Sequence, residues 1–529
     1  MLPASGVYRP EWTCGRYNEE KQVAIMYNLI EGMSYFFESY SAAVIGAVLA
    51  VGKNGRVDLA QTAENTGIAE ESVGEFFDEL LKLSLLVGEV PDKLKISAYR
   101  KRVGSINKAR GDGIDKTKQD DCVVEMESAE YAYMKEVGGV TSVMFELTYN
   151  CSERCIHCYN PGATRNDAEQ SGRARQEMTF GDYQRIIDEL YGLGLMKVCL
   201  SGGDPFSSPL VWQIIGYLYR KGIATDIYTN GLSLVGQVDR LTAYHPRSVG
   251  ISLYSGRAED HDAITRTKGS FQKSLQAARD LAGNGVPMYI KCCVTRTNVK
   301  TYSMVAAIAE ELGAILQTDI LAINAVDGDR CAGENLLLTP EMLEIVLLDE
   351  NVPAHVVKES LNLEGKPKQM DSHSCNGGRN SFCVTPEGNV QPCTTFPCSF
   401  GNLKIQSFSD ILQNNEDLKW WHNLTLKDFE DCGKNDYCAY CSLCAGNNYI
   451  EHGTPLFAAE SNCYIAKARY ELAAKMKNGC DPLKGGTLQQ RLSELQPESR
   501  PLQRVINPNG GNHRGGRING SSKTDATIM

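Results

Sequence analysis

The chain has 529 residues, of which 42% are hydrophobic and 22% charged, and its formal net charge is −11. These proportions are typical of a globular protein, and the length exceeds what one compact core supports, so about three domains are expected. The negative charge argues against nucleic acid as the main partner, because proteins that bind phosphates carry a basic surface. No stretch of about 18 apolar residues is present to span a membrane, so no membrane partner is expected.

The chain contains 19 cysteines, an odd number, and most of them fall into closely spaced groups. Its first residues, Met1-Leu-Pro-Ala-Ser5, lack the basic start and apolar run of a secretory signal. Disulfides are therefore not expected, and the thiols are predicted to bind metal in a reducing cytoplasm.

Residues 1–100 predict a hairpin followed by three helices, from apolar residues at strand and then helical spacing. The expected elements are strands at 22–28 and 33–37 and helices at 41–51, 58–66 and 69–85. The last helix has a broad apolar stripe that must face a core. This order predicts a small winged helix-turn-helix domain.

Two functions compete for that domain. A DNA-binding helix-turn-helix needs basic and amide side chains on its recognition helix, but Ala69-Glu-Glu-Ser-Val-Gly-Glu-Phe-Phe-Asp-Glu-Leu80 is acidic. The hairpin and helices instead resemble the PqqD-like recognition element of ribosomal-peptide maturases, in which a leader peptide adds a strand to the hairpin edge. A purely structural subdomain is the alternative. The basic, glycine-punctuated stretch from Lys93 has no clear periodicity, and residues 101–140 are predicted to be a linker.

The motif Cys151-Ser-Glu-Arg-Cys155-Ile-His-Cys158 follows an apolar, strand-like run at 143–150. Three thiols at this spacing can converge on one metal centre. Structural zinc sites and ordinary iron–sulfur clusters have four protein ligands, so three ligands leave one metal position open for a substrate or cofactor. A zinc knuckle is the alternative, because cysteine triplets also build zinc sites.

This Cys-x3-Cys-x2-Cys motif resembles the signature of the radical S-adenosylmethionine (SAM) enzymes. The resemblance implies that Cys151, Cys155 and Cys158 hold a [4Fe–4S] cluster whose fourth iron binds SAM. An electron from the cluster would cleave SAM to methionine and a 5′-deoxyadenosyl radical, which abstracts hydrogen from the substrate. It also implies a reductant such as flavodoxin or ferredoxin.

Apolar strands alternate with amphipathic helices over residues 141–335, which predicts a parallel sheet with crossover helices. Six such units match the partial (β/α)6 barrel of radical SAM enzymes, so the expected class is α/β. The predicted strands are 142–148, 197–201, 225–229, 248–254, 288–294 and 315–323, and the helices between them include 179–192 and 270–285.

Marked residues follow the C-terminal ends of these strands, where parallel barrels place their chemistry. Gly202-Gly203-Asp204-Pro205 resembles the family's Gly-Gly-Glu-Pro, which binds the SAM amino group, although aspartate is the shorter acid. Tyr228-Thr-Asn-Gly231 resembles the family's segment after the third strand. Ser252 matches the position that reaches the SAM ribose. Arg266 is a candidate partner of the SAM carboxylate, because a guanidinium binds carboxylate in bidentate fashion, with a surface arginine as the alternative.

Nine cysteines lie between Cys375 and Cys463. The spacing Cys375-x12-Gly388-x4-Cys393 resembles the opening of the SPASM domain, which carries auxiliary [4Fe–4S] clusters and is predicted, with a bridging segment, at 336–478. Asn435 stands where many such domains have a cysteine, and Cys438 follows three residues later. The resemblance implies Cys375, Cys393 and Cys444 as ligands of the nearer cluster, with Cys383 or Cys398 as candidate fourth ligand, and Cys432, Cys438, Cys441 and Cys463 as ligands of the farther cluster. Two zinc sites are the alternative.

Residues 479–529 lose apolar periodicity and are predicted to be disordered. The resemblances cover roughly residues 20 to 475 and predict a cytoplasmic radical SAM/SPASM maturase, with three [4Fe–4S] clusters, of a ribosomally made precursor peptide. The enzyme would hold the leader at its N-terminal domain and close a thioether or carbon–carbon link. The alternatives are a radical SAM maturase of a folded protein, such as one that forms formylglycine, a peptide decarboxylase, and a zinc-rich winged-helix DNA-binding regulator.

Overall fold

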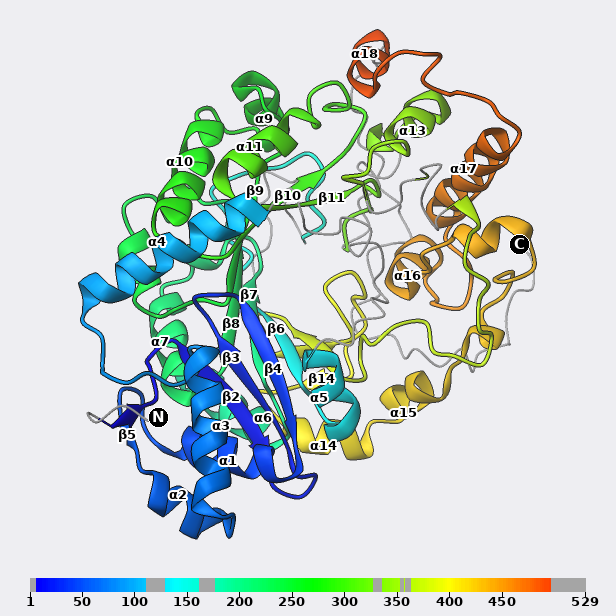
Figure 1. Cartoon of the computed structure of the whole chain (residues 1–529). Helices are drawn as coiled ribbons and strands as arrows, with labels where there is room; N and C mark the ends of the chain where they lie inside the picture. The colour runs from blue at the N-terminus through cyan, green and yellow to red at the C-terminus, as the bar shows by residue number, and fades with distance from the viewer. Residues whose placement is uncertain are drawn as a thin grey trace.

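The computed structural model describes residues 6–110, 129–160, 177–326, 335–352, 356 and 363–495 of the chain. Its largest element is a sheet with the strand order β11-β10-β9-β8-β7-β6-β12-β13-β14 (Figure 1). Six neighbouring strands of this sheet run parallel. They are β6 (Ser142–Glu146), β7 (Lys197–Ser201), β8 (Ala224–Thr229), β9 (Ser248–Ser252), β10 (Met288–Cys293) and β11 (Ile315–Asp319).

Helices connect the parallel strands and pack against one face of the sheet. They are α6 (Phe180–Gly192), the short η2 (Pro205–Ser207), α7 (Val211–Lys221), α8 (Val238–Thr242), α9 (Ala258–Thr265), α10 (Ser270–Gly283) and α11 (Met304–Leu312). The predicted α/β class with a partial (β/α)6 barrel is confirmed, although several strands end earlier than expected.

The alternation of side chains gives the sheet two different faces. In β7, Val198 and Leu200 are fully buried in a hydrophobic core that also contains Ile187 of α6. Successive side chains of a strand point to opposite faces, so Lys197 and Cys199 lie on the other face, inside the barrel. The same rule assigns the inner residues of every parallel strand.

A strand from the C-terminal cysteine region continues this sheet. Strand β12 (Ser381–Val384) pairs in parallel with β6, and Cys383 lies opposite Met144. β13 (Asn389–Gln391) and β14 (Gly401–Asn402) follow in antiparallel pairing. The cysteine spacing does not predict these short strands. Because β6 has neighbours on both sides, the barrel and the first part of the cysteine region share one sheet.

The rest of the C-terminal region is mainly helical: α14 packs beside α6, whereas α13, α16, α17 and α18 lie at the upper right of Figure 1. Its helices are α13 (Pro340–Val346), α14 (Phe408–Asn414), α15 (Glu416–Asn423), η4 (Leu426–Asp428), η5 (Asp436–Tyr440), α16 (Ala445–His452), α17 (Glu460–Lys477) and α18 (Leu488–Glu494). No helix in the described ranges is long and apolar enough to cross a membrane.

The N-terminal residues form a separate antiparallel sheet in the order β2-β3-β4. Its strands are β2 (Thr13–Asn18), β3 (Val23–Asn28) and β4 (Met33–Glu38), and a two-stranded ladder joins β1 (Val7–Tyr8) to β5 (Arg56–Val57). Helices α1 (Ser39–Ala50), α2 (Leu59–Thr66) and α3 (Glu70–Lys82) pack on this sheet and on one another. The predicted hairpin and three helices are present, and β2 is additional. The winged-helix assignment and the domain boundaries stay predictions.

Two segments differ from what the sequence suggested. Lys93–Arg110, expected as irregular chain leading into a linker, forms helix α4, which buries Ile96 and Val103 beside Trp12 and Ile30. The expectation of disorder from residue 479 is wrong for 479–495, because Leu492 of α18 and Leu495 directly after it are buried in the main core. In both segments a few apolar side chains bind to a surface supplied by distant parts of the chain. The remainder of the predicted tail lies outside the described residues.

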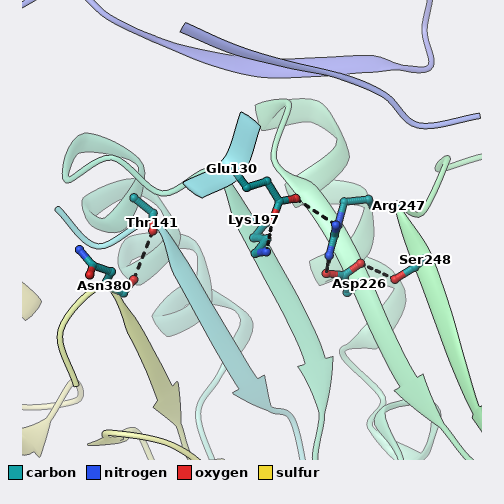
Figure 2. A network of polar contacts seen from close by, with 7 residues as sticks. All are labelled: Glu130, Thr141, Lys197, Asp226, Arg247, Ser248 and Asn380. Atoms are coloured by element: carbon teal, nitrogen blue, oxygen red, sulfur yellow. Dashed lines mark hydrogen bonds and ion pairs between the residues drawn. The ribbon is translucent and has the colours of Figure 1, made fainter. Parts of the chain in front are cut away.

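Helix α5 (Ala129–Val137) lies between the N-terminal sheet and the barrel and carries a charged residue into a polar network (Figure 2). Glu130 accepts a hydrogen bond of 3.0 Å from Arg247 and forms an ion pair with Lys197. Arg247 also pairs with Asp226, which accepts a hydrogen bond from Ser248. Burial alone would raise the pKa of Glu130, but the two cations lower it below its ordinary value. The network holds two cations and two carboxylates, so its charges balance.

We expect Glu130→Gln to lower the free energy of unfolding by about 2 kcal/mol, because it leaves two partly buried cations without a shared partner. Since the folded-state pKa of Glu130 is lowered, the loss should be complete above the unfolded pKa of about 4.3. It should shrink as the pH falls through the folded-state value. Denaturant unfolding of both proteins across this pH range measures it. Glu136→Gln, on an exposed residue of the same helix, is the matched control, and an equal loss there would contradict the assignment.

Candidate functional site

The loop that carries Cys151, Cys155 and Cys158 leaves the C-terminal end of β6 and is held by backbone hydrogen bonds on two sides. On one side, the Gly203 N–H donates to the carbonyl of Thr148 at 2.7 Å, and the Asp204 N–H donates to Asn150 at 3.0 Å. On the other side, the loop's Arg154 and Ile156 N–H groups donate to carbonyls at the end of α9, each at 2.9 Å. The loop is therefore fixed between the ends of β7 and α9.

Two glycines permit this close approach. A Cβ atom at Gly203 would lie 2.5 Å from the carbonyl oxygen of Asn150 and 2.7 Å from that of Tyr149. A Cβ atom at Gly202 would lie 2.3 Å from the oxygen of Thr148, and the φ angle of Gly202 is +118°. Any side chain at either position must push the cysteine loop away. The Gly-Gly pair therefore has a structural role at the site in addition to the role that the resemblance implies.

The three thiols of the loop lie close enough to influence one another electrostatically. Burial, with a smaller contribution from the neighbouring Cys151, raises the pKa of Cys158 to about 12. The pKa of Cys155 is raised for the same reasons, with contributions from Cys151 and Cys158. Asn230, from the segment after β8, donates to the Cys151 sulfur at 3.4 Å. Without metal the thiols are neutral, so metal binding must release their protons.

Asp204 is fully buried beside this loop and has one carboxylate oxygen available. Its Oδ1 accepts a hydrogen bond from the Thr229 hydroxyl, while Oδ2 is buried and has no hydrogen-bond partner among the described residues. Burial raises the pKa of Asp204 to about 6. A buried acceptor without a donor is costly, and an ammonium group would satisfy it. The residues present therefore fit the amino group of SAM.

The other two predicted SAM contacts lie near the loop in different surroundings. Ser252 ends β9 and is half-buried, next to the hydroxyl of Tyr254. Arg266 ends α9 with a φ angle of +52°, directly after the Thr265 carbonyl that accepts a hydrogen bond from the cysteine loop. Its side chain is exposed. The structure brings both residues to the site, and their roles stay predictions.

Three cysteines of the nearer predicted cluster also lie together. Burial, with smaller contributions from Cys444 and Cys375, raises the pKa of Cys393 to about 12. Of the two candidate fourth ligands, Cys383 is buried on β12 and interacts electrostatically with Cys393. Cys398 instead faces Tyr449, to which it is hydrogen bonded. The structure therefore favours Cys383.

The four cysteines of the farther predicted cluster line a single cavity. They are Cys432, Cys438, Cys441 and Cys463. The pKa of Cys441 is raised to about 12, by burial first and then by the other thiols of this set. Asn435, the departure from the family spacing, immediately precedes η5, and its carbonyl accepts a hydrogen bond of 2.9 Å from Cys438. One short helical turn thus carries Cys438 into the cavity.

In the part of the chain that the structure describes, no group of three His, Cys, Asp or Glu side chains is arranged to hold a single metal ion. A four-iron cluster binds each thiolate to a different iron, so it separates its ligands more widely than one zinc ion does. The three groups of neighbouring thiols are the candidate ligands of the predicted clusters. Their assignment as ligands stays a prediction.

Gly203→Ala tests the close approach of β7 to the cysteine loop. The added Cβ would displace the loop at Asn150 and Tyr149, so we expect the purified protein to lose the iron of one cluster and keep the rest. Iron and sulfide analysis with visible absorption measures this. Gly181→Ala, at a helical position where the new Cβ meets nothing closer than 3.7 Å, should keep full iron content. Equal iron in both variants would contradict the prediction.

Cys383 and Cys398 form a matched pair of buried cysteines. If Cys383 is the fourth ligand of the nearer cluster, Cys383→Ala should lower iron content or change the electron paramagnetic resonance spectrum of the reduced auxiliary clusters. Cys398→Ala should change neither, because Cys398 faces Tyr449. The reverse pattern would assign Cys398 as the ligand.

Comparisons with known proteins agree with this geometry. Residues 145–309 match the model of the radical SAM superfamily, and residues 375–445 match that of the SPASM iron-sulfur cluster-binding domain. The AdoMet-dependent heme synthase of Methanosarcina barkeri is 26% identical over 329 residues, which are 58% of this chain and 90% of that protein. The subtilosin biosynthesis protein AlbA of Bacillus subtilis is 27% identical over 308 residues, 57% of this chain and 66% of that protein.

The mycofactocin maturase MftC of Mycobacterium tuberculosis is 33% identical over 357 residues, which are 62% of this chain and 84% of that protein. Among solved structures, SuiB of Streptococcus suis bound to S-adenosylmethionine has a similar fold, with a TM-score of 0.50 and 14% identity, covering 86% of this chain and 99% of that one. With both cluster-binding models matched and a relative at this level of identity, the chain belongs to the radical SAM superfamily, among the members that carry a SPASM domain.

Proposed function

We propose that the protein modifies a ribosomally made precursor peptide by hydrogen abstraction and closes a thioether or carbon–carbon cross-link. The observation that carries this proposal is the pairing of β6 with β12 in one parallel sheet. The loop with the cysteine triplet follows β6, and Cys383 lies on β12, so this pairing places both on neighbouring strands of the same barrel wall. A radical-generating centre and an auxiliary cluster can then serve one substrate.

The radical SAM and SPASM domains imply a SAM-binding [4Fe–4S] cluster and auxiliary clusters. Cys151, Cys155 and Cys158 would hold the first cluster, and Asp204 would accept hydrogen bonds from the SAM amino group through its free oxygen. Ser252 and Arg266 would contact the ribose and the carboxylate. When bound, the cluster and SAM supply a 5′-deoxyadenosyl radical, and the protein supplies positioning and exclusion of water.

An auxiliary cluster suits a cross-linking reaction for a chemical reason. Closing a carbon-centred radical into a new bond releases one electron, which needs an acceptor. Cys375, Cys393, Cys444 and Cys383 would hold such an acceptor beside the barrel, and the cavity lined by Cys432, Cys438, Cys441 and Cys463 would hold a second. A flavodoxin or ferredoxin would supply the first electron.

Two observations support a peptide as substrate. The relatives AlbA and MftC are named for bacteriocin biosynthesis and for maturation of mycofactocin. In the described N-terminal sheet, β4 is an edge strand that pairs on one side with β3. An unpaired strand edge can accept an added strand, so it could bind the leader, which would raise the concentration of the core peptide at the barrel.

The first test is anaerobic purification followed by reduction in the presence of SAM. We expect about twelve iron atoms, four for each of three clusters, and formation of 5′-deoxyadenosine. A variant with Cys151, Cys155 and Cys158 changed to alanine should lack one cluster and form no 5′-deoxyadenosine. Cys292→Ala is the control and should remain active, because Cys292 is buried in the core between the sheet and its helices. Zinc without 5′-deoxyadenosine would overturn the proposal.

The peptide is tested separately, by coexpression with a short peptide encoded beside this gene. Each cross-link should remove one pair of hydrogen atoms from the peptide, which mass spectrometry detects. Formation of 5′-deoxyadenosine without any change in peptide mass would overturn the peptide substrate and leave the radical chemistry standing. A loss of carbon dioxide instead of hydrogen would identify a decarboxylase.

A further inference from the structure

The inner wall of the barrel carries a lysine that the proposed chemistry does not use. In β10, Ile290 and Cys292 are buried in the core on the helix side of the sheet, so Lys291 points into the barrel. Gln317 of β11 lies beside Lys291 in the parallel register. Both Gln317 and Asp319 of β11 are exposed, although they belong to the inner face. The wall is therefore exposed at β11, where a substrate could approach, while the neighbouring Lys291 is half-buried.

A glycine makes room for the lysine side chain. Gly250 lies on β9, between β8 and β10, opposite Tyr228 on one side and Tyr289 on the other. A Cβ atom at Gly250 would lie 2.9 Å from the Cε atom of Lys291 and 2.9 Å from the Cδ1 atom of Tyr228. The space left by the missing side chain lets the lysine chain cross β9 and reach the tyrosine ring. Packing over Gly250 therefore directs the Lys291 side chain toward Tyr228.

The ammonium group of Lys291 ends 3.7 Å from the centre of the Tyr228 ring. Within the described residues it has no carboxylate in ion-pair contact. Three acidic groups act on it electrostatically: burial raises the pKa of the Cys199 thiol and keeps it neutral, Asp226 is bound by Arg247 and Ser248, and Asp319 accepts a hydrogen bond of 2.9 Å from the Leu321 N–H. The attraction of a ring face compensates only part of the hydration free energy that an ammonium group loses on burial. The group is prepared for an anion that the described chain does not provide.

The position of Lys291 along the strands is close to the predicted SAM site. Lys291 is opposite Ser252, the predicted ribose contact, in the register of β9 and β10. Tyr228, which receives the ammonium, is two residues before Asn230, whose side chain donates to Cys151. Two residues of a strand span about 6 to 7 Å. An anion bound to Lys291 would therefore sit one layer below the centre at which SAM is cleaved.

We propose that Lys291 binds a carboxylate of the substrate and thereby positions the residue attacked by the radical. This inference rests on the proposed peptide substrate, and the carboxylate is either the C-terminal group of the peptide or an Asp or Glu side chain in its core. A charge-assisted hydrogen bond from the ammonium fixes the acid. Burial lowers the pKa of Lys291, and a bound carboxylate would favour the charged form again.

The test combines changes in the lysine with changes in the acid. The enzyme is used as holoprotein in three forms: wild type, Lys291→Met and Lys291→Arg. The peptide that wild type modifies is synthesised with free acids, with an amidated C-terminus, and with each core Asp or Glu replaced by Asn or Gln. Lys273→Met, on an exposed residue of α10, is the matched control. Peptide KM, kcat and peptide-free formation of 5′-deoxyadenosine are measured for each pair.

We expect Lys291→Met to raise the peptide KM about tenfold to a hundredfold, with partial recovery in Lys291→Arg. Peptide-free formation of 5′-deoxyadenosine should be unchanged. Neutralising one carboxylate of the peptide should cost wild type the same factor and cost Lys291→Met nothing further. Which neutralised form has this effect identifies the carboxylate as C-terminal or side-chain.

Four results would overturn the inference. If wild type modifies every neutralised peptide as efficiently as the acidic peptide, no carboxylate is bound. This comparison uses only the wild-type enzyme, so it does not depend on whether a variant folds. If the losses from lysine and acid multiply, the two groups act independently. If Lys291→Met weakens SAM binding instead, the lysine serves the SAM carboxylate. If wild type modifies no peptide at all, the proposed function fails first; in the other three cases it stands and only the role of Lys291 is rejected.

Discussion

The parallel pairing of β6 with two neighbours, β7 and β12, determines where the proposed cluster ligands near the barrel can lie. On the β7 side, the pair Gly202-Gly203 approaches the cysteine loop so closely that a single Cβ atom would collide with its backbone. On the β12 side, the pairing sets Cys383 level with the interior of the barrel. Parallel strands have their C-terminal ends at one edge of the sheet, so the strand arrangement by itself brings these segments together.

Burial sets the chemistry of these loops in the absence of metal. The thiols and Asp204 have raised pKa values because each is desolvated and most have acidic neighbours. A group of anions in this environment would repel itself, so the protonated forms prevail. Bound iron and the ammonium of SAM supply the missing positive charge, and both therefore bind in exchange for protons. The site is complete electrostatically only with its cofactors.

Sequence patterns predicted much of the barrel and less of its surroundings. Lys197–Ser201 was predictable to the residue because Val198 and Leu200 alternate with less apolar neighbours, and its place was marked by the glycines that follow. Strand β12 has four residues, and its pairing with β6 joins segments more than two hundred positions apart, which no local pattern records. Helix α4 has almost no apolar stripe, and a few side chains attach it: Ile96, Tyr99 and Val103 pack in one small cluster, and Arg100 donates a hydrogen bond to the Thr242 carbonyl.

Some site residues were also predictable from the sequence, and others were found only from the fold. Cysteine spacing marked the triplet and the set that lines the C-terminal cavity, and the structure accounts for Asn435, where spacing alone left the loop uncertain. The preference for Cys383 over Cys398 comes from the fold, because both follow Cys375 at unremarkable distances, and it stays a prediction. Lys291 gave no signal, because a lysine within an apolar strand is equally consistent with an exposed edge. Its neighbours Gly250 and Tyr228 are set by register across three strands.

Charge balance distinguishes the structural ions of the barrel from the one with a proposed function. Near the N-terminal ends of the strands, Glu130 and Asp226 neutralise Lys197 and Arg247 within one hydrogen-bonded network (Figure 2). Such a network holds α5 to the strands and has no capacity for another ion. Lys291 lies nearer the C-terminal ends of the strands on the same wall, with an aromatic ring in place of a counter-ion. A desolvated cation is costly to keep unpaired, so its retention in the interior is better explained by a substrate that carries the opposite charge.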